Sequence, residues 1–356
     1  MQAWPNTVLT ELLKIRYPII QAPMAGSDSP ALVASVSNAG GLGSLGAAYM
    51  KPEAIQTAIK KIRELTDKPF NINLFIPEAH TATEQQISWM HNKLAQMCSS
   101  FIDSPEPVKP PYAQPFAEQI AVVLAAKVPV FSFTFGMLST EWIIKLKANG
   151  TRLIGTATTL TEAMQLADNN IDIIVAQGSE AGGHRGTFMT QAEDALIGNF
   201  ALIPQIVDRI NKPIVAAGGI MDGRGIVAAL VLGACGVQMG TAFLSCPEAG
   251  INEKYRELLL KTKQDNTTLT RAFSGRMARG IHNKFIEDMA HYPEHILPFP
   301  IQNALTRPMR NAAAKNNLTD YLSLWAGQAS YLSHGITADK LIRQLAAEVQ
   351  QLLKNL

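Results

Sequence analysis

The feature that most constrains the fold of this chain is a series of eight short, nearly all-apolar runs. They alternate with segments in which apolar residues recur with the helical period. The runs cover residues 18–24, 41–46, 70–75, 128–134, 152–156, 171–177, 213–218 and 236–240. Parallel strands that are buried on both faces have this apolar composition. Eight of them alternating with helices predict an α/β fold, a TIM (β/α)8 barrel, in preference to an open sheet.

The intervening segments carry helix-boundary signals. Residues 29–38 are followed by Gly40, and residues 52–65 begin with proline at the first turn. Thr159 and Glu162 have the spacing of a capping box. Helices are also expected over residues 223–232 and, as an amphipathic closing helix, over residues 338–353.

Two long segments interrupt the repeat, at residues 77–127 and 246–324. The first contains a proline-rich stretch, residues 104–111, that is incompatible with a helix interior. Insertions in barrels accumulate at the carboxyl ends of the strands, where active sites lie. We therefore expect a barrel of residues 1–245 plus 325–356, with an insertion at about 77–127. Residues 246–324 are expected to form a smaller, mainly helical substrate-side or lid domain.

Composition excludes several classes of protein. The formal net charge is +2, from 31 basic and 29 acidic residues, which argues against nucleic-acid binding through a basic face. The longest apolar stretch, residues 226–237, is shorter than the ~20 residues of a membrane-spanning helix. The three cysteines show no CxxC spacing, and the N-terminus shows no signal-peptide pattern. These observations predict a cytoplasmic protein without a structural disulfide framework or metal site.

Residues at the predicted strand ends suggest a phosphorylated planar cofactor. Glycines follow strands seven and eight, where barrels commonly bind phosphate through backbone N–H groups. Side-chain amides near the barrel mouth are suited to the edge of a flat heterocycle such as that of FMN. The candidate backbone N–H groups are those of Gly218, Gly219, Gly240 and Thr241. The side-chain amides are those of Asn71, Gln177 and Gln238.

His184 is the candidate catalytic residue. It lies in a glycine-rich loop after strand six, residues 178–186, and is the side chain of that loop that titrates near neutral pH. A histidine exchanges protons near neutral pH, and the flanking glycines leave room for a substrate.

Two motif matches are discounted. Residues 41–46 match GxGxxG, but they follow a helix and are themselves predicted to be strand two, so they do not indicate dinucleotide binding. Residues 291–295 match HxxEH, but Pro293 disrupts the helix that would place both histidines on one face. No metal site is expected.

Several of these segments together resemble the nitronate monooxygenases, and more narrowly their class I. The resemblance runs over nearly the full length, and residues 180–186 are its most specific part. The matching segments are residues 21–26, 40–46, 178–186, 216–220, 238–241 and 325–328.

The resemblance implies an FMN-containing barrel that oxidises alkyl nitronates, of the propionate 3-nitronate type, with O2 to a carbonyl product and nitrite. It makes His184 the base for neutral nitroalkanes and places Met24 near the flavin. The implied FMN contacts are Asn71, Gln177, Gly182, Gly219, Gln238, Met239, Gly240 and Thr241. A monomer or a homodimer is expected.

The chain departs from the class I pattern on the substrate side. Where the family carries tyrosines and a basic residue, the candidate positions here are Phe299, Asn303 and Arg307. Arg307 or Arg310 is suited to meeting a carboxylate or a nitronate.

Two further functions stay open on the sequence alone. One is an FMN-dependent enoyl-acyl-carrier-protein reductase that uses NAD(P)H, and the more remote one is a non-catalytic flavin-binding protein. An inosine-monophosphate-dehydrogenase-like barrel is disfavoured, because no cysteine lies in a strand-end loop.

Overall fold

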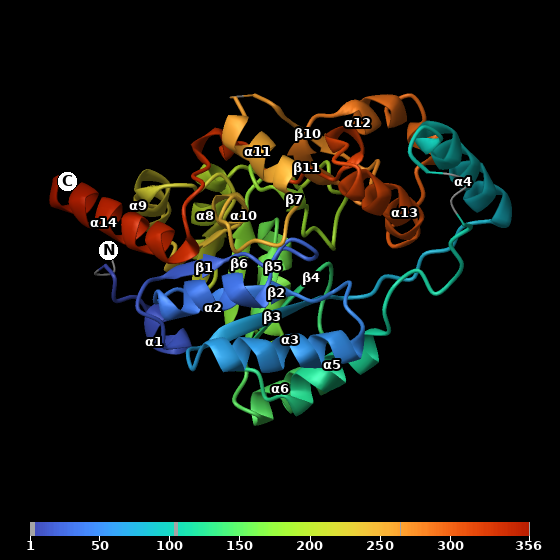
Figure 1. Cartoon of the computed structure of the whole chain (residues 1–356). Coiled ribbons are helices and arrows are strands. Elements are labelled where there is room, and N and C mark those ends of the chain that lie inside the picture. The colour runs from blue at the N-terminus through green and yellow to red at the C-terminus, as the bar shows by residue number, and fades with distance from the viewer. Residues whose placement is uncertain (1–3, 103–105, 264, 356) are drawn as a thin grey trace.

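The computed structural model describes residues 4–102, 106–263 and 265–355, and these form a barrel of eight parallel strands (Figure 1). The strand order is β1-β9-β8-β6-β5-β4-β3-β2, and a parallel bridge between Ile20 and Leu42 closes the ring. The barrel strands are β1 (Ile19–Gln21), β2 (Gly43–Gly46), β3 (Phe70–Phe75), β4 (Val130–Thr134), β5 (Arg152–Ala157), β6 (Ile173–Gln177), β8 (Ile214–Ala217) and β9 (Gly236–Met239). The predicted TIM barrel is confirmed. Every strand falls inside its predicted range, except that β5 extends one residue beyond it.

Alternate residues of each strand pack inside and outside the barrel, as the two-residue period of a strand requires. In β4, Phe131 and Phe133 pack in the core beneath the outer helices, whereas Val130 belongs to an interior cluster with Ile20 and Val215. Because both faces of the strands are buried, apolar residues dominate them.

Helices surround the strands, and four of those named below, α1, α2, α7 and α9, begin at a residue whose side chain caps them. Ser29 and Thr159 accept hydrogen bonds from the third residue of their helices. The predicted capping box at Thr159 is only half present, because Glu162 accepts from the backbone N–H of Thr158 instead. The helices around the barrel are α1 (Val8–Leu13), α2 (Pro30–Asn38), α3 (Pro52–Leu65), α5 (Phe116–Ala125), α6 (Thr140–Ala148), α7 (Leu160–Asp168), α8 (Asn199–Val207), α9 (Gly223–Val231), α10 (Thr241–Leu244) and α14 (Ala338–Asn355). As expected, α14 packs on the barrel, against α9 and α2.

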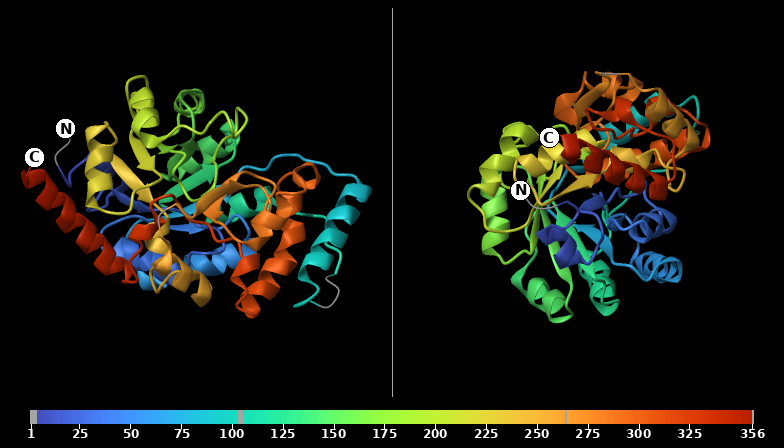
Figure 2. Two further views of the ribbon diagram at one scale, coloured as in Figure 1. Left: turned by 90° about the horizontal axis from the view of Figure 1, so that it is seen from above. Right: turned by 90° about the vertical axis from the view of Figure 1, so that its left-hand side faces the viewer.

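The substrate-side domain draws on both insertions. Its helices are α4 (Glu84–Cys98), α11 (Glu253–Lys261), α12 (Lys284–Met289) and α13 (Ile301–Lys315), with the short 3-10 helices η1 (Pro293–His295), η2 (Thr319–Tyr321) and η3 (Ser330–Leu332) nearby. Helix α4, from the first insertion, packs against α13, from the second. The left-hand view of Figure 2 shows α4 beside the orange helices at one end of the molecule and α14 at the other. Of the proline-rich stretch, residues 104 and 105 lie outside the described residues, and 106–111 are not helical.

A small antiparallel sheet joins this domain to the barrel, and no sequence pattern predicted it. Strand β10 (Thr267–Thr270) pairs with β11 (Ala278–Ile281), which in turn pairs with β7 (Gly183–His184) in the loop after β6. The second insertion is therefore helical with a β-hairpin, and that hairpin reaches the loop that carries the candidate catalytic histidine.

No helix within the described ranges is long and apolar enough to cross a bilayer.

Candidate active site

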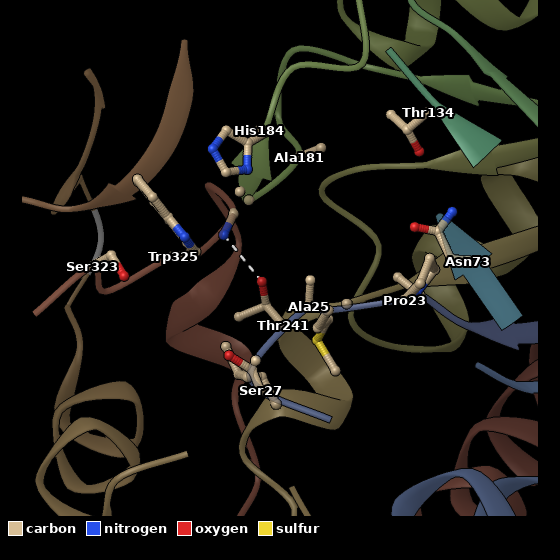
Figure 3. Close-up of a pocket in the computed structure, with 18 of the residues that line it drawn as sticks. Pro23, Ala25, Ser27, Asn73, Thr134, Ala181, His184, Thr241, Ser323 and Trp325 are labelled. Carbon is tan, nitrogen blue, oxygen red and sulfur yellow. Dashed lines mark hydrogen bonds between the residues drawn. The ribbon is translucent and has the colours of Figure 1, made fainter. Parts of the chain in front are cut away.

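A cavity of about 540 Å³ opens at the carboxyl ends of the barrel strands (Figure 3). Its volume is within the range of about 300–1,000 Å³ typical of small-molecule sites. Loops that follow most of the barrel strands contribute to its wall, together with α13 and residues 322–329. Among the predicted site residues, the cavity is lined by Met24, Gln177, Gly182, His184, Gly219, Gln238, Met239, Gly240, Thr241, Asn303, Arg307 and Arg310.

His184 lies in this wall within a cage of aromatic rings. Its ring centroid is 5.4 Å from that of Trp325, 5.8 Å from Phe135, 6.2 Å from Phe299 and 6.4 Å from Phe75. The strand pairing of β7 with β11 fixes the backbone on which the imidazole stands. The imidazole also lines the cavity, where Figure 3 shows it beside Trp325.

The environment of His184 keeps its imidazole neutral. Burial lowers the pKa of His184 to about 3, and the positive charges of Arg276 and Arg310 act in the same direction. Above that pH the imidazole is unprotonated, so one ring nitrogen has a free lone pair at neutral pH. His184 is therefore in the protonation state that a base requires.

Ser274 contacts one nitrogen of the imidazole. The buried Ser274 Oγ lies 2.8 Å from His184 Nε2 and 3.1 Å from the carbonyl oxygen of Arg276, to which its hydroxyl can donate. When the hydroxyl hydrogen is used in that bond, Nε2 must carry the proton of the neutral ring and donate it to Ser274 Oγ. We infer from this hydrogen-bond network that Nδ1 is the basic nitrogen. Nothing in the sequence pattern singled out Ser274, which is 90 residues from His184.

Gln177 clamps the loop on both sides of His184. Its Nε2 donates to the carbonyl oxygen of His184 at 3.0 Å, and its Oε1 accepts from the N–H of Gly186 at 2.8 Å. Gln177 also lines the cavity, so the same side chain holds the loop and borders the space for a ligand.

A buried arginine fastens the start of the same loop. Arg185 is fully buried and donates to the carbonyl oxygens of Gly178, Gln177 and Ala195, at 2.5, 3.1 and 2.9 Å. Burial lowers the pKa of Arg185 to about 10, against the opposing effect of nearby Glu180. The guanidinium thus stays charged at neutral pH.

Two further charged groups hold the loop farther along. Buried Glu162 accepts from the N–H groups of Phe188 and Met189, at 2.6 and 3.1 Å. Arg276 pairs with Glu78 at 2.9 Å, and its guanidinium lies 4.0 Å from the ring centroid of Phe135. Charged residues from α7, the segment after β3 and the second insertion therefore converge on one loop.

At the glycine-rich wall of the cavity, three chain segments lie too close together to leave space for a side chain between them. A Cβ at Gly182 would lie 2.5 Å from the backbone nitrogen of Gly327, and Gly218 has φ +110°. Thr241 Oγ accepts from Gly327 N–H at 3.0 Å, the dashed line of Figure 3. The result is a cradle of backbone around the mouth of β8 and β9, of the kind that binds phosphate oxygens.

The structure places the two asparagines of β3 differently from the sequence prediction. Asn71 does not line the cavity: it is fully buried below it and donates to Ser44 Oγ and Ser132 Oγ, at 3.1 and 2.8 Å. Asn73, two residues closer to the carboxyl end and on the same face, lines the cavity and donates to Ser132 Oγ at 2.9 Å. The period of two places both asparagines on one face of β3, so it does not by itself choose between them.

The substrate side of the cavity carries two guanidinium groups. Arg310 donates to the carbonyl oxygen and to Oδ1 of Asn303, at 2.8 and 2.9 Å, and its Nε has no partner among the described residues. Arg307 lies over the ring of Tyr49, 5.0 Å from its centroid. Burial lowers the pKa of Arg310 to about 10, partly opposed by Tyr49 and reinforced by Arg307. No carboxylate is among the groups that act on Arg310, so this wall is positively charged and suited to an anion.

Phe299 separates the first cavity from a second one. It contacts the His184 ring but lines only the second cavity, which is described below. The other predicted substrate residues, Met24, Asn303 and Arg307, line the first.

The three cysteines lie away from this chemistry. Cys98, Cys235 and Cys246 are free thiols, buried, and absent from the lining of the cavity. Burial raises the pKa of Cys98, and it raises those of Cys235 and Cys246 to about 12.

Residues 291–295 do not form a metal site. Residues 293–295 form a single 3-10 turn, and the ring of His295 stacks on Trp89 at 3.8 Å. Across residues 4–102, 106–263 and 265–355, no group of three or more His, Cys, Asp or Glu side chains is arranged to hold a metal ion.

Known proteins are similar to this chain over nearly its full length. The family profile described as nitronate monooxygenase matches residues 6–348. A probable nitronate monooxygenase of Staphylococcus haemolyticus (strain JCSC1435) is 45% identical over 98% of this chain and 99% of its own. A protein of the same description from Staphylococcus aureus (strain Newman) is 43% identical over 99% of each chain.

Solved structures are similar over the whole chain as well. Nitroalkane oxidase from Streptomyces ansochromogenes has a TM-score of 0.90 and 37% identity, covering 98% of this chain and 99% of that one. FabK from Thermotoga maritima has a TM-score of 0.77 and 29% identity, covering 98% of each chain.

Proposed function

The chain belongs to the nitronate monooxygenase family, flavin-dependent oxidoreductases, and we propose that it uses FMN and O2 to oxidise alkyl nitronates of the propionate 3-nitronate type. The products are a carbonyl compound and nitrite. The observation that carries this proposal is a neutral, caged His184 that lines the same cavity as the guanidinium groups of Arg307 and Arg310.

The cavity wall fits FMN in two respects. The backbone at Gly182, Gly218 and Gly219 lines the cavity, and backbone N–H groups at such a wall are suited to phosphate oxygens. Side-chain amides border the cavity from three strands, and they are suited to the polar edge of a planar ring. We propose Gly182, Gly219 and residues 239–241 as the phosphate-side contacts, and Asn73, Gln177 and Gln238 as the amides that border the cavity. Asn71 stays a proposed contact, because its buried Oδ1 has no partner among the described residues. FMN bound there supplies the redox-active ring that accepts electrons from the substrate.

His184 acts on neutral nitroalkanes. Its unprotonated Nδ1 removes a proton from the carbon next to the nitro group, and the adjacent cations stabilise the negative charge that develops on the nitro oxygens. A substrate that arrives as a nitronate is already deprotonated and bypasses this step. We therefore assign His184 as the general base for one substrate form and as a neutral wall of the cavity for the other.

Arg307 and Arg310 select the anionic substrate. Propionate 3-nitronate carries a nitronate and a carboxylate, and two guanidinium groups without carboxylate partners match these two charges. Asn303 holds Arg310 in place through two hydrogen bonds.

One anaerobic titration tests the proposal against its main alternative. The protein is purified, loaded with FMN, and mixed with either propionate 3-nitronate or NADPH while the flavin absorbance is followed. We expect spectral reduction with the nitronate alone, and oxygen uptake with nitrite release once air is admitted. Rapid bleaching by NADPH without a nitro compound would instead favour an NAD(P)H-dependent enoyl-acyl-carrier-protein reductase.

Two other results would contradict the proposal. A protein that stays colourless after reconstitution with FMN has no site for the cofactor. A protein that binds FMN but consumes no oxygen with any nitronate is a non-catalytic flavin binder. Gel filtration in the same preparation tests the expected monomer or homodimer.

Ser274→Ala tests the proposed tautomer of the base. Loss of the hydroxyl removes the partner of His184 Nε2, and a single hydrogen bond contributes about 0.5–1.5 kcal/mol. We expect kcat/KM for neutral nitroethane to fall about three- to tenfold, with a smaller fall for pre-formed ethyl nitronate. Ser323→Ala is the matched control, because Ser323 lines the same cavity without contacting the imidazole. Equal losses on both substrate forms would show that Ser274 has only a structural role.

A further inference from the structure

A second cavity, of about 430 Å³, adjoins the first on its substrate side. It lies between the loops after β2 and β3, the chain segment 108–119 and helix α13. Most of its wall is apolar, and the apolar lining includes Ile76, Pro77, Val108, Phe116, Phe299 and Ala304.

The two cavities share part of their lining. The residues that line both are Tyr49, Phe75, Asn303, Arg307 and Asn311. Three of these lie on one face of α13, and their side chains, with the two aromatic rings, form the partition. A molecule whose head lies in the first cavity can therefore extend into the second past these side chains.

The second cavity presents almost no free charge. Glu78 is paired with Arg276 at 2.9 Å and with His80 at 2.9 Å. Arg307 is positioned over Tyr49 at the partition, where its charge faces the head of a ligand. The remaining wall is mainly hydrocarbon and aromatic surface, with the side-chain amides of Gln114, Gln119, Asn303 and Asn311 among it. Covering an apolar chain with that hydrocarbon surface gains free energy.

We propose that the second cavity binds the apolar tail of the substrate and gives this enzyme a preference for nitronates with a medium-length alkyl chain. The anionic head lies against His184, Arg307 and Arg310, and the tail enters the second cavity past Phe75, which lines both cavities. This inference rests on the proposed function for the identity of the head group. Tail binding itself depends only on the shape and polarity of the second cavity.

The length of the alkyl tail determines how much the affinity is expected to rise. Burying one methylene contributes about 0.8 kcal/mol, which corresponds to about a fourfold gain in affinity. Over three or four methylenes that enter the cavity, the gain is on the order of a hundredfold. The gain ends when the cavity is filled.

The first experiment measures binding without turnover. Saturated carboxylates from propionate to octanoate replace the nitronates, since a carboxylate is likewise a planar anion with two oxygens. Their affinities for the FMN-loaded protein are measured by calorimetry. We expect the dissociation constant to fall about fourfold per methylene beyond butyrate. A flat series would overturn the proposal.

Two variants fill the cavity from opposite sides. Ala304→Phe does so from α13 and Val108→Phe from the insertion, whereas Ala304→Ser leaves the volume nearly unchanged and is the matched control. Neither position lines the first cavity. In each protein we compare kcat/KM for hexyl nitronate with that for ethyl nitronate. The ratio is expected to drop at least tenfold in both phenylalanine variants and to stay at the wild-type value in Ala304→Ser.

The outcomes separate this inference from the proposed function. If carboxylate affinity rises with chain length and either folded phenylalanine variant abolishes the rise, the cavity binds alkyl tails even when no nitronate is oxidised. If nitronates are oxidised but a phenylalanine variant that retains wild-type thermal stability and FMN content keeps the full chain-length preference, the tail lies elsewhere and the proposal fails.

Discussion

Replacing His184 by asparagine is expected to lower kcat/KM for neutral nitroethane by about 10²- to 10⁴-fold, the usual contribution of a positioned base. Turnover of pre-formed ethyl nitronate should fall less than about tenfold, because that substrate needs no proton removal. Asparagine keeps a polar side chain of similar reach, so the Phe75 and Trp325 rings still enclose the site. Oxygen consumption with each substrate form, measured at the same FMN content, checks the prediction.

The exposed His282 provides the control. His282→Asn alters a histidine of the substrate-side domain that does not line the cavity, and both activities should stay within about twofold of wild type. If His184→Asn loses both activities to the same extent, His184 is not primarily a base.

The lowered pKa of His184 also predicts how kcat/KM and folding stability vary with pH. Because that pKa is about 3, the base stays unprotonated as the pH falls through 6.5, so the kcat/KM profile for nitroethane should show no acid limb near 6.5. The unfolded chain binds a proton at this histidine below pH 6.5, whereas the folded chain binds it only near pH 3. Folding stability is therefore lost progressively as the pH falls from 6.5 toward 3, and His184→Asn should lose less over that interval. An acid limb at 6.5 in the wild type would contradict the assignment.

Arg185→Leu is expected to cause the largest loss of stability, about 3–5 kcal/mol in the free energy of unfolding by urea. The substitution leaves three backbone carbonyl oxygens without their donors and removes a buried positive charge near Glu180 and Glu162. Since Arg185 fastens the loop next to His184, activity should fall along with stability.

Arg343→Leu is the matched control for this change. Arg343 is 75% exposed and pairs with Asp339 one helical turn away on α14. An exposed pair of this kind contributes at most about 1 kcal/mol, so the variant should unfold close to wild type. A loss at Arg185 no larger than that at Arg343 would mean that the buried guanidinium is dispensable.

Sequence periodicity predicts the barrel well, since each strand is a local apolar run and each helix begins at a local signal. The helix at Pro52–Leu65 is predicted to the residue, because proline at the first turn and the apolar spacing are both contained in that segment. The same local reasoning separates strand β2 from a dinucleotide-binding motif.

The candidate site is predictable only where it depends on strand ends. Gln177, His184 and Gln238 follow from the rule that barrel chemistry lies at the carboxyl ends, and all three line the cavity. The choice between Asn71 and Asn73 is harder, because both lie on the inward face and the depth of a side chain within the barrel depends on strand stagger. Stagger depends on how neighbouring strands are aligned, so the sequence of one strand does not determine it.

Contacts between residues that are far apart in the chain cannot be predicted from local sequence patterns. Ser274 meets His184 across 90 residues, and β7 consists of two residues whose partner strand begins at Ala278. Neither carries a local signal, because a two-residue strand has no periodicity and a serine is common in loops. The packing of α4 against α13 likewise depends on two insertions meeting in space.

The burial of all three thiols has a practical consequence for work on this protein. A protonated, enclosed thiol is a poor nucleophile, so Cys98, Cys235 and Cys246 should react slowly with maleimides in the folded state. A cysteine introduced at an exposed position, such as Leu260 on α11, would then be labelled selectively in the otherwise wild-type chain. Fluorophores or spin labels can therefore report on the substrate-side domain without first removing the native cysteines.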